Sequence, residues 1–386
     1  MQRAANRPDA QKIECVRELE GHLRIVKLER KFYKDAIEKV KETPGIETRK
    51  PGTHEKNTFP VNHVSFDFAQ QTHYPYSPQQ PGPIFFKTPR KCGLFGINAE
   101  ALGKQVNFLI DEAHACGKGA NSVISYLHFY LENYSIGEIF LMLHADNASG
   151  QNKNNYVMWY LHWRILTERN KDISISFFIA GHTKFAPDGG FGLLKRKLKN
   201  QEVNSLRDIE AATNASSDMN VAEVVGWEND AESRIPTYDW VGFLTPFYKK
   251  IPGLKKYHHF IFDDSPKVTV KLDSSDPGCK VAMYDVRPVF PAELPNIIPA
   301  PGLPNKRQWN LYKDIREFVC DDMKDTVCPK PSEPLEKEPA PKPSTSKAKP
   351  VAAPKRKKVA APKRKTTAST SSGSNKKRHN VCFYFY

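Results

Sequence analysis

Residues 139–155 read IFLMLHADNASGQNKNN, and this stretch decides the fold class that we predict. Its first five residues are continuously apolar and of strand length, which is typical of a strand buried on both faces of a parallel sheet. A polar loop follows, and residues 155–167 have the apolar content of a helix. A strand, a crossover helix and a further strand are the units from which α/β sheets are built.

The flanking segments extend this pattern in both directions. Upstream we expect strands at 63–68, at 84–88 with 94–97 continuing or pairing beside it, and at 106–110, then a helix at 121–134; downstream we expect a buried strand at 173–179 and a basic helix at 191–199. The order β-β-β-α-β-α-β-α has three sequential strands as a meander and later strands that arrive through helical crossovers. It predicts an α/β fold with one mixed sheet and helices on both faces.

Composition divides the chain into four expected segments. These are an N-terminal helix and linker (1–56), the α/β core (57–202), an irregular polar stretch with a small β-rich accessory module (203–328), and a tail (329–386). The tail consists mainly of Pro, Lys, Ala, Ser and Thr, which bury too little apolar surface to fold, so we expect disorder there.

Charge is concentrated in that tail. The formal net charge is +15, of which +12 lies in residues 329–386, so the body is nearly neutral. The basic residues of the tail stand in short clusters, which are typical of a nuclear import signal bound by an import receptor, or of non-specific contacts with nucleic acid. The alternative is a solvated tail that binds no partner. The two clusters that we expect to direct nuclear import consist of Lys355, Arg356, Lys357, Lys358, Lys363, Arg364 and Lys365.

Several classes of protein are excluded by what the chain lacks. No stretch approaches the roughly 18 apolar residues of a membrane span, and the N-terminus has no apolar signal core, so neither membrane attachment nor secretion is expected. Seven scattered cysteines without a CxxC pair indicate free thiols in a reducing compartment. Glycine-rich nucleotide loops, GxSxG and HExxH are absent, which argues against kinases, serine hydrolases and zincins.

Three aspartates lie in or just after predicted strands. Asp67 is within the first strand, Asp146 follows the apolar run of residues 139–143, and Asp188 begins the last helix. Sites in α/β sheets gather at the carboxyl ends of strands, and three carboxylates could hold two Mg²⁺ (or Mn²⁺) ions about 3.5–4 Å apart. Any one of them also fits an ordinary turn or helix cap. Asp111 and Glu112, at the end of the third strand, are alternative ligands.

The loop 144–155 is longer and more polar than a connection requires. It carries one acid, a serine, a lysine and five amides, whereas a purely structural loop needs two to six residues and one cap. Amides and lysine suit phosphates and base edges, and redundant caps are the alternative. The loop residues that we expect to bind nucleic acid are Asn147, Gln151, Asn152 and Lys153.

Residues 146–155 resemble the DNxSGQNKNN signature of a transposon-related family of animal genomes. The core of that family is similar to the ribonuclease H-like fold of DD[E/D] transposases and integrases. The GHTKF element at 181–185, and KIPG at 250–253 followed by YHHF at 257–260, are similar to the same family, so the resemblance covers roughly residues 57–272. Alanine at 148 and the glycine pair at 189–190 depart from the family's usual residues.

The resemblance implies roles for individual residues. Asp67, Asp146 and Asp188 would be the three carboxylate ligands, with Glu202 a poorer candidate for the third. His182 would move a proton or contact a phosphate, or else donate to a carbonyl within its loop. Four basic residues would contact the DNA backbone: Lys184, Lys195, Arg196 and Lys197. The alternative is that they form a solvated helix face. Ala69 stands where the exonuclease variant of the fold needs a second acid, which disfavours that variant.

These observations leave two expected functions. The first is a transposase-derived enzyme that cuts or joins DNA by two-metal phosphoryl transfer. The second is a catalytically inactive nuclear DNA-binding or scaffold protein that retains the fold. No zinc-finger or helix-turn-helix pattern precedes the core, so we expect this chain to be a fragment of a protein that recognises DNA ends elsewhere. The sequence gives no indication of oligomeric state.

Overall fold

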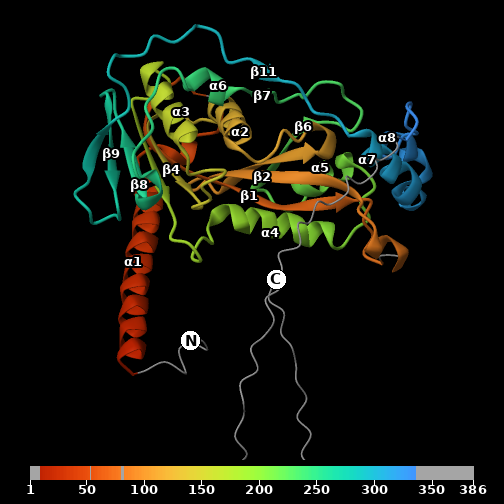
Figure 1. Cartoon of the computed structure of the whole chain (residues 1–386), viewed down its shortest axis with the longest axis horizontal. Helices are drawn as coiled ribbons and strands as arrows, with labels where there is room; N and C mark the ends of the chain where they lie inside the picture. Colours follow the sequence, from red (N-terminus) through yellow and green to blue (C-terminus); the bar gives the residue numbers. More distant parts are fainter. Residues whose placement is uncertain (1–8, 53, 80–81, 336–386) are drawn as a thin grey trace, which may run out of the picture. The chain divides into compact units, whose positions relative to one another are not determined.

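A computed structural model of the chain describes residues 9–52, 54–79 and 82–335. A nine-stranded sheet lies at the centre of these residues (Figure 1). Its strands are β1 (Phe59–Tyr74), β2 (Arg90–Ala99), β3 (Lys104–Asp111), β4 (Glu138–Ala145), β5 (Asp172–Phe177), β6 (Asn220–Gly226), β8 (His259–Phe262), β9 (Lys267–Lys271) and β10 (Cys279–Ala282). They are ordered β10-β9-β8-β5-β4-β1-β2-β3-β6.

The sheet is mixed, as predicted. β1, β2 and β3 form an antiparallel meander, while β4 pairs parallel with β1 and β5 parallel with β4. β6 adds a parallel strand beside β3. The strands that we assigned to an accessory module do not form a separate sheet, because β8 pairs antiparallel with β5 and carries β9 and β10 outward from it.

Helices cover both faces of the sheet (Figure 1). The helices on one face are α2 (Ala120–Asn133), α3 (Asn155–Leu166) and α6 (Trp240–Leu244), and those on the other are α1 (Asp9–Lys41), α4 (Ala186–Leu198) and α5 (Leu206–Asn214). The first face holds the larger apolar core, in which Trp159 and Trp240 are fully buried. Short elements complete the body: the paired strands β7 (Thr237–Tyr238) and β11 (Ile297–Ile298), and the helices α7 (Asn305–Asn310) and α8 (Lys324–Val327).

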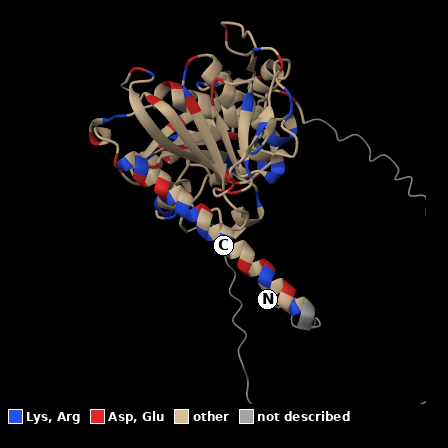
Figure 2. Ribbon diagram, turned by 90° about the vertical axis from the view of Figure 1, so that its left-hand side faces the viewer, with Lys and Arg blue, Asp and Glu red and all other residues tan. Residues whose placement is uncertain are grey.

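The helix predicted at residues 9–43 is α1, and its two halves differ. In the second half, Tyr33, Ala36 and Val40 are buried against the sheet. In the first half, Ile13 and Val16 are more than half exposed. In Figure 2 the positions of basic and acidic residues are distributed along the helix. The apolar spacing therefore continues along a helix of which only the C-terminal half is covered by the body.

The strand predicted at 84–88 is wrong. Residues Gly82–Phe86 form a short 3-10 helix, η3, with Phe85 and Phe86 at 73% and 88% exposure. Proline at 83 has no N–H for a ladder and its fixed φ suits the first turn of a helix. The apolar pair Phe85-Phe86 suggested a buried strand, but its exposure shows that the pair packs on no core.

The irregular structure predicted for the first part of segment 203–328 is also wrong, because it contains α5 and β6. A capping box begins α5: Ser205 Oγ accepts from the Asp208 N–H, and Asp208 accepts from the Ser205 N–H at 2.9 Å. The motif S-x-x-D is visible in the sequence and is a known helix-start signal. Its presence at 205–208 was the information needed to predict the helix.

Candidate active site

Asp67 and Asp146 are brought together by strand register. β1 and β4 run parallel, and their last paired residues are Phe66 and Ala145. Asp67 is the next residue of β1 and Asp146 directly follows β4, so the two backbones place them as neighbours, about 5 Å apart between strands. Beyond Phe66, β1 remains paired with β2, and there Asp67 lies opposite Gly96, a residue without a side chain.

The pKa of Asp67 reflects its burial and the acids near it. Burial, followed by the charges of Asp146 and Asp188, raises the pKa of Asp67 to about 7. Lys118 opposes them, and its Nζ lies 3.4 Å from the Ala69 carbonyl oxygen. Lys118 was not among the predicted site residues, because a single lysine in the loop before α2 has no sequence signature.

Asp146 is fixed by its own loop. Asn152 donates its side-chain N–H₂ to Asp146 Oδ1 at 2.5 Å, and the Ala148 N–H donates to the same oxygen at 3.2 Å. Asp146 itself is half-buried, whereas Asn152 is fully buried. A buried amide bound to a carboxylate restricts its rotamers, so Asp146 is held in one orientation.

Asp188 lies in the first turn of α4, where it has a structural role. Its Oδ2 accepts from the Phe185 N–H at 3.1 Å, the contact of a helix cap. α4 packs close to the sheet because Gly190 has no side chain: a Cβ there would lie 2.3 Å from Gln105 Oε1. Asp188 is exposed, yet it contributes to the negative field at Asp67.

The other amides of the loop 144–155 serve mainly as supports. Asn154 Oδ1 caps α3 by accepting from the Val157 N–H, and Asn155 Oδ1 accepts from the Ile251 N–H at 2.8 Å. Among the four loop residues that we expected to bind nucleic acid, Asn152 and Lys153 are buried, whereas Asn147 and Gln151 are partly exposed. Asn154 and Asn155 therefore fit the structural alternative for this loop, in which its amides cap and support the backbone.

The remaining predicted residues lie on α1's side of the site or on α4. The ring of His182 lies 5.2 Å from that of His22 on α1, and Arg30 donates to the His182 carbonyl at 2.8 Å. Arg30 also donates to the carbonyl of Lys184, whose side chain is exposed. On α4, Lys195 is half-buried, and Arg196 and Lys197 are exposed.

Asp111 and Glu112, the alternative metal ligands, are engaged in ion pairs. Arg90 donates to both oxygens of Asp111 at 2.7 and 2.8 Å, and Tyr74 donates its hydroxyl to Oδ2 at 2.6 Å. Burial opposes the effect, but these hydrogen bonds lower the pKa of Asp111. Glu112 receives two hydrogen bonds from Arg307, each at 2.8 Å. Both acids therefore stabilise the fold instead of forming a site.

The donor set at Asp67 and Asp146 fits a hard divalent cation only in part. Burial and the neighbouring Asp146 keep Asp67 protonated up to about pH 7. A bound cation would relieve the repulsion between the two carboxylates. Among the described residues, no group of three or more His, Cys, Asp or Glu side chains is arranged to hold a metal ion. The capping bond of Asp188 would have to open for its carboxylate to join the pair.

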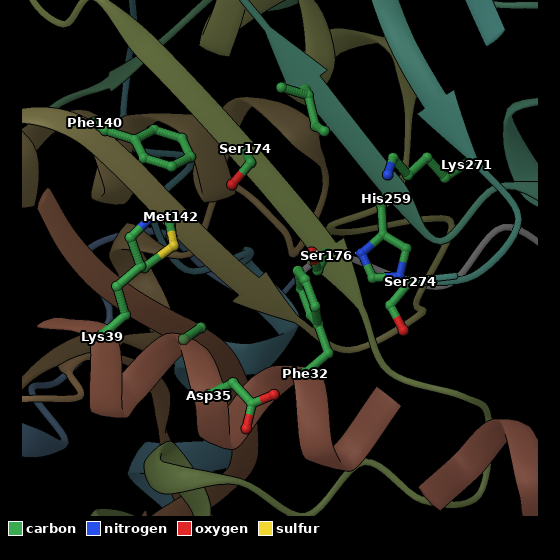
Figure 3. A pocket seen from close by; sticks show the side chains of 12 residues that line it. Phe32, Asp35, Lys39, Phe140, Met142, Ser174, Ser176, His259, Lys271 and Ser274 are labelled. Carbon is green, nitrogen blue, oxygen red and sulfur yellow. Dashed lines mark hydrogen bonds between the residues drawn. The ribbon is translucent and has the colours of Figure 1, made fainter. Parts of the chain in front are cut away.

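A separate cavity of about 300 Å³ lies between α1 and strands β4, β5, β8 and β9. Figure 3 shows Phe32 and Asp35 of α1 on one side, and Ser176 and His259 of the sheet on the other. Ser176 Oγ and His259 Nδ1 are 2.8 Å apart, and a Glu29 carboxylate oxygen lies 2.9 Å from His259 Nε2. These buried polar groups bind α1 to the sheet.

No helix among the described residues is long and apolar enough to cross a membrane. The six described cysteines are free thiols.

Residues 91–276 match a family described as a domain of unknown function (DUF7869). The matched range contains Asp146 and Asp188 but begins after Asp67. Neither the curated proteins nor the solved structures include a match to this chain.

Proposed function

We propose that this protein has a ribonuclease H-like core and transfers phosphoryl groups in DNA, cutting or joining strands, as a relative of transposases. The observation that carries the proposal is that Asp67 of β1 and Asp146, which directly follows β4, lie beside each other on two adjacent parallel strands, where burial and the charge of Asp146 raise the pKa of Asp67 to about 7. Carboxylates from neighbouring strands are the donors that divalent cations use in phosphoryl transfer.

The order of elements supports the fold assignment. The meander β1-β2-β3, followed by α2-β4-α3-β5-α4, is the order expected for a ribonuclease H-like core. The three aspartates occupy the first strand, the end of the fourth and the helix after the fifth, which are the positions that the resemblance to DD[E/D] enzymes implies.

In this proposal Mg²⁺ or Mn²⁺ would be held by Asp67 and Asp146, with Asp188 as the third ligand. When bound, the metal supplies Lewis acidity and an activated water or 3′-hydroxyl. Asp67 must be ionised to bind, which its pKa of about 7 allows at neutral to alkaline pH. Asn152 keeps Asp146 oriented, and Lys118 supplies positive charge near Asp67. Exposed residues of α4 would contact the DNA backbone.

A second function is a nuclear DNA-binding or scaffold protein that keeps this fold without cutting. The capping bond between Asp188 and the Phe185 N–H favours it, because that bond occupies one oxygen of the third carboxylate. A two-metal site needs all three carboxylates free to turn toward the ions.

Nuclear location is proposed from the tail, of which residues 336–386, with both basic clusters, lie outside the described residues. The two basic clusters at 355–358 and 363–365 would bind an import receptor. A fluorescent fusion lacking residues 350–380 should stay in the cytoplasm, and full nuclear entry of that fusion would refute the assignment.

The test of catalysis is nicking of supercoiled plasmid DNA in Mg²⁺ or Mn²⁺, with EDTA as the blank. We expect cleavage by the wild-type chain and none by Asp146→Ala. DNA binding without nicking by either protein would favour the second function. Equal nicking by both would remove the proposed mechanism.

A further inference from the structure

Residues 249–256, KKIPGLKK, form a surface segment that we call the lysine loop. It contains four lysines and no acid. Lys249 is neutralised by Asp285, whose Oδ2 lies 2.5 Å from Nζ. The other three, Lys250, Lys255 and Lys256, have exposed side chains.

The lysine loop is fastened to the structure that follows Asp146. Asn155 Oδ1 accepts from the Ile251 N–H at 2.8 Å. Trp159, in the next turn of α3, donates its ring N–H to the Lys249 carbonyl at 3.0 Å. These contacts hold the loop at the carboxyl ends of β4 and β5, where Asp146 follows β4 and Asp67 lies beside it on β1.

The third fastening is made by a buried lysine. Lys153 is only 1% exposed and donates Nζ to the Lys255 carbonyl at 3.1 Å, with the Phe177 ring 5.4 Å from Nζ. Burying an ammonium is costly, and here burial lowers its pKa to about 8. Lys153 adjoins Asn152, which holds Asp146. One short segment therefore positions both the acid and the lysine loop.

We propose that the lysine loop binds the phosphate backbone of DNA beside the scissile phosphodiester; this rests on the proposed function. Three acids repel a polyanionic substrate, so the site needs fixed positive charge on the flanking phosphates. Lys250, Lys255 and Lys256 supply it at the same sheet edge. Phosphate contacts of this kind position the strand without reading its sequence.

The competing account is that these lysines are solvated and touch nothing. The two accounts differ in salt dependence. Each phosphate that a lysine neutralises releases counterions from the DNA, and this adds about 0.9 to the steepness with which log affinity falls against log salt. Three contacts correspond to a slope difference of about 2 to 3. Between 50 and 200 mM salt the wild-type chain would then lose about 40-fold more affinity than a variant without them.

The test is fluorescence anisotropy of a labelled 30-base-pair duplex with the full chain, in EDTA, across that salt range. The variant carries Lys250→Gln, Lys255→Gln and Lys256→Gln. The matched control carries Lys171→Gln, Lys267→Gln and Lys280→Gln, which are also exposed. Lys171 directly precedes β5 and Lys267 begins β9, so both lie at the end of the sheet opposite to the lysine loop. Thermal unfolding of all three proteins verifies that they fold alike.

We expect the loop variant to have a slope lower by about 2 to 3 and the control to match the wild-type chain. Equal slopes for the loop variant and the wild type would overturn the inference, and so would a wild-type chain that does not bind the duplex. Plasmid nicking by the same proteins separates the two proposals. Nicking with unchanged slopes removes only the lysine loop, whereas a reduced slope without nicking by the wild type removes only catalysis.

Discussion

Asp67 and Asp146 follow directly on Phe66 and Ala145, the last paired residues of two adjacent parallel strands, and burial together with the charge of Asp146 raises the pKa of Asp67. Two carboxylates held side by side on neighbouring strands repel each other, which lowers the stability of the fold. Proteins keep such pairs where a cation or a proton relieves the repulsion. The pair is therefore the feature of this molecule that most strongly indicates chemistry.

Asp67→Asn should change how stability depends on pH. The folded protein keeps the Asp67 proton up to about pH 7, while the unfolded chain releases it near the ordinary value of 3.8. The stability that this proton gives is full below about pH 4 and is lost as pH rises through 7. We expect Asp67→Asn to have a higher Tm than the wild type at pH 8 and a similar Tm at pH 4.

Asp172→Asn serves as the control, because Asp172 is an exposed aspartate at the start of β5. Its Tm should follow that of the wild-type chain at both pH values. A difference between Asp67→Asn and wild type that is the same at pH 4 and pH 8 would show that the repulsion at Asp67 is not the cause.

Divalent metal should stabilise the wild-type chain. At pH 8, millimolar Mn²⁺ binding to Asp67 and Asp146 would remove their repulsion and raise Tm by mass action, about 2.7 kcal/mol at 100 times the dissociation constant. Asp146→Asn should lose this Tm increase, and Asp172→Asn should retain it. An increase of the same size in all three proteins would mean that Mn²⁺ binds elsewhere.

Asn152→Ala should weaken the support of Asp146. The variant removes a buried amide that donates to the carboxylate at 2.5 Å, and hydrogen bonds to charged groups contribute about 1.5–3 kcal/mol. We expect a loss of about 2 kcal/mol in the free energy of unfolding, measured in urea. Asn147→Ala, a partly exposed amide five residues earlier, should cost less than about 0.5 kcal/mol. Similar losses for both variants would contradict the positioning role of Asn152.

Glu29→Gln should loosen α1. Burial opposes the effect, but His259 and the Ser274 N–H lower the pKa of Glu29, so its contribution is present at neutral pH and is lost as pH falls below the ordinary glutamate range. At pH 7 we expect faster tryptic cleavage after the basic residues of α1 in Glu29→Gln. The exposed Glu38, on the same helix, provides the matched control as Glu38→Gln. Equal cleavage rates would show that the buried contact does not hold the helix.

Part of this architecture could be predicted because it depends on local patterns. The apolar run 139–143 and the helical spacing of 121–134 predict β4 and α2, and acids placed after strands predict that Asp67 and Asp146 meet. The cap motif at 205–208 was also local, so α5 was predictable and was missed.

The rest depends on contacts between distant segments. Lys153 is buried because the lysine loop, about 100 residues away, supplies a carbonyl to it, whereas an isolated lysine is normally expected at the surface. Asp111 is unavailable to a metal because Arg90, two residues before the Cys92 that pairs with Asp111 across β2 and β3, donates to both of its oxygens. Neither relationship has a periodicity or a motif that a single sequence displays.

The central claim is tested most directly by the rate of plasmid nicking in saturating Mn²⁺ at pH 8. The wild-type chain should nick, Asp67→Asn and Asp146→Ala should fall to the rate of the EDTA blank, and Asp172→Asn should nick at the wild-type rate. Nicking by Asp67→Asn or Asp146→Ala at the wild-type rate, or no metal-dependent nicking by the wild-type chain, would contradict catalysis at this pair of carboxylates.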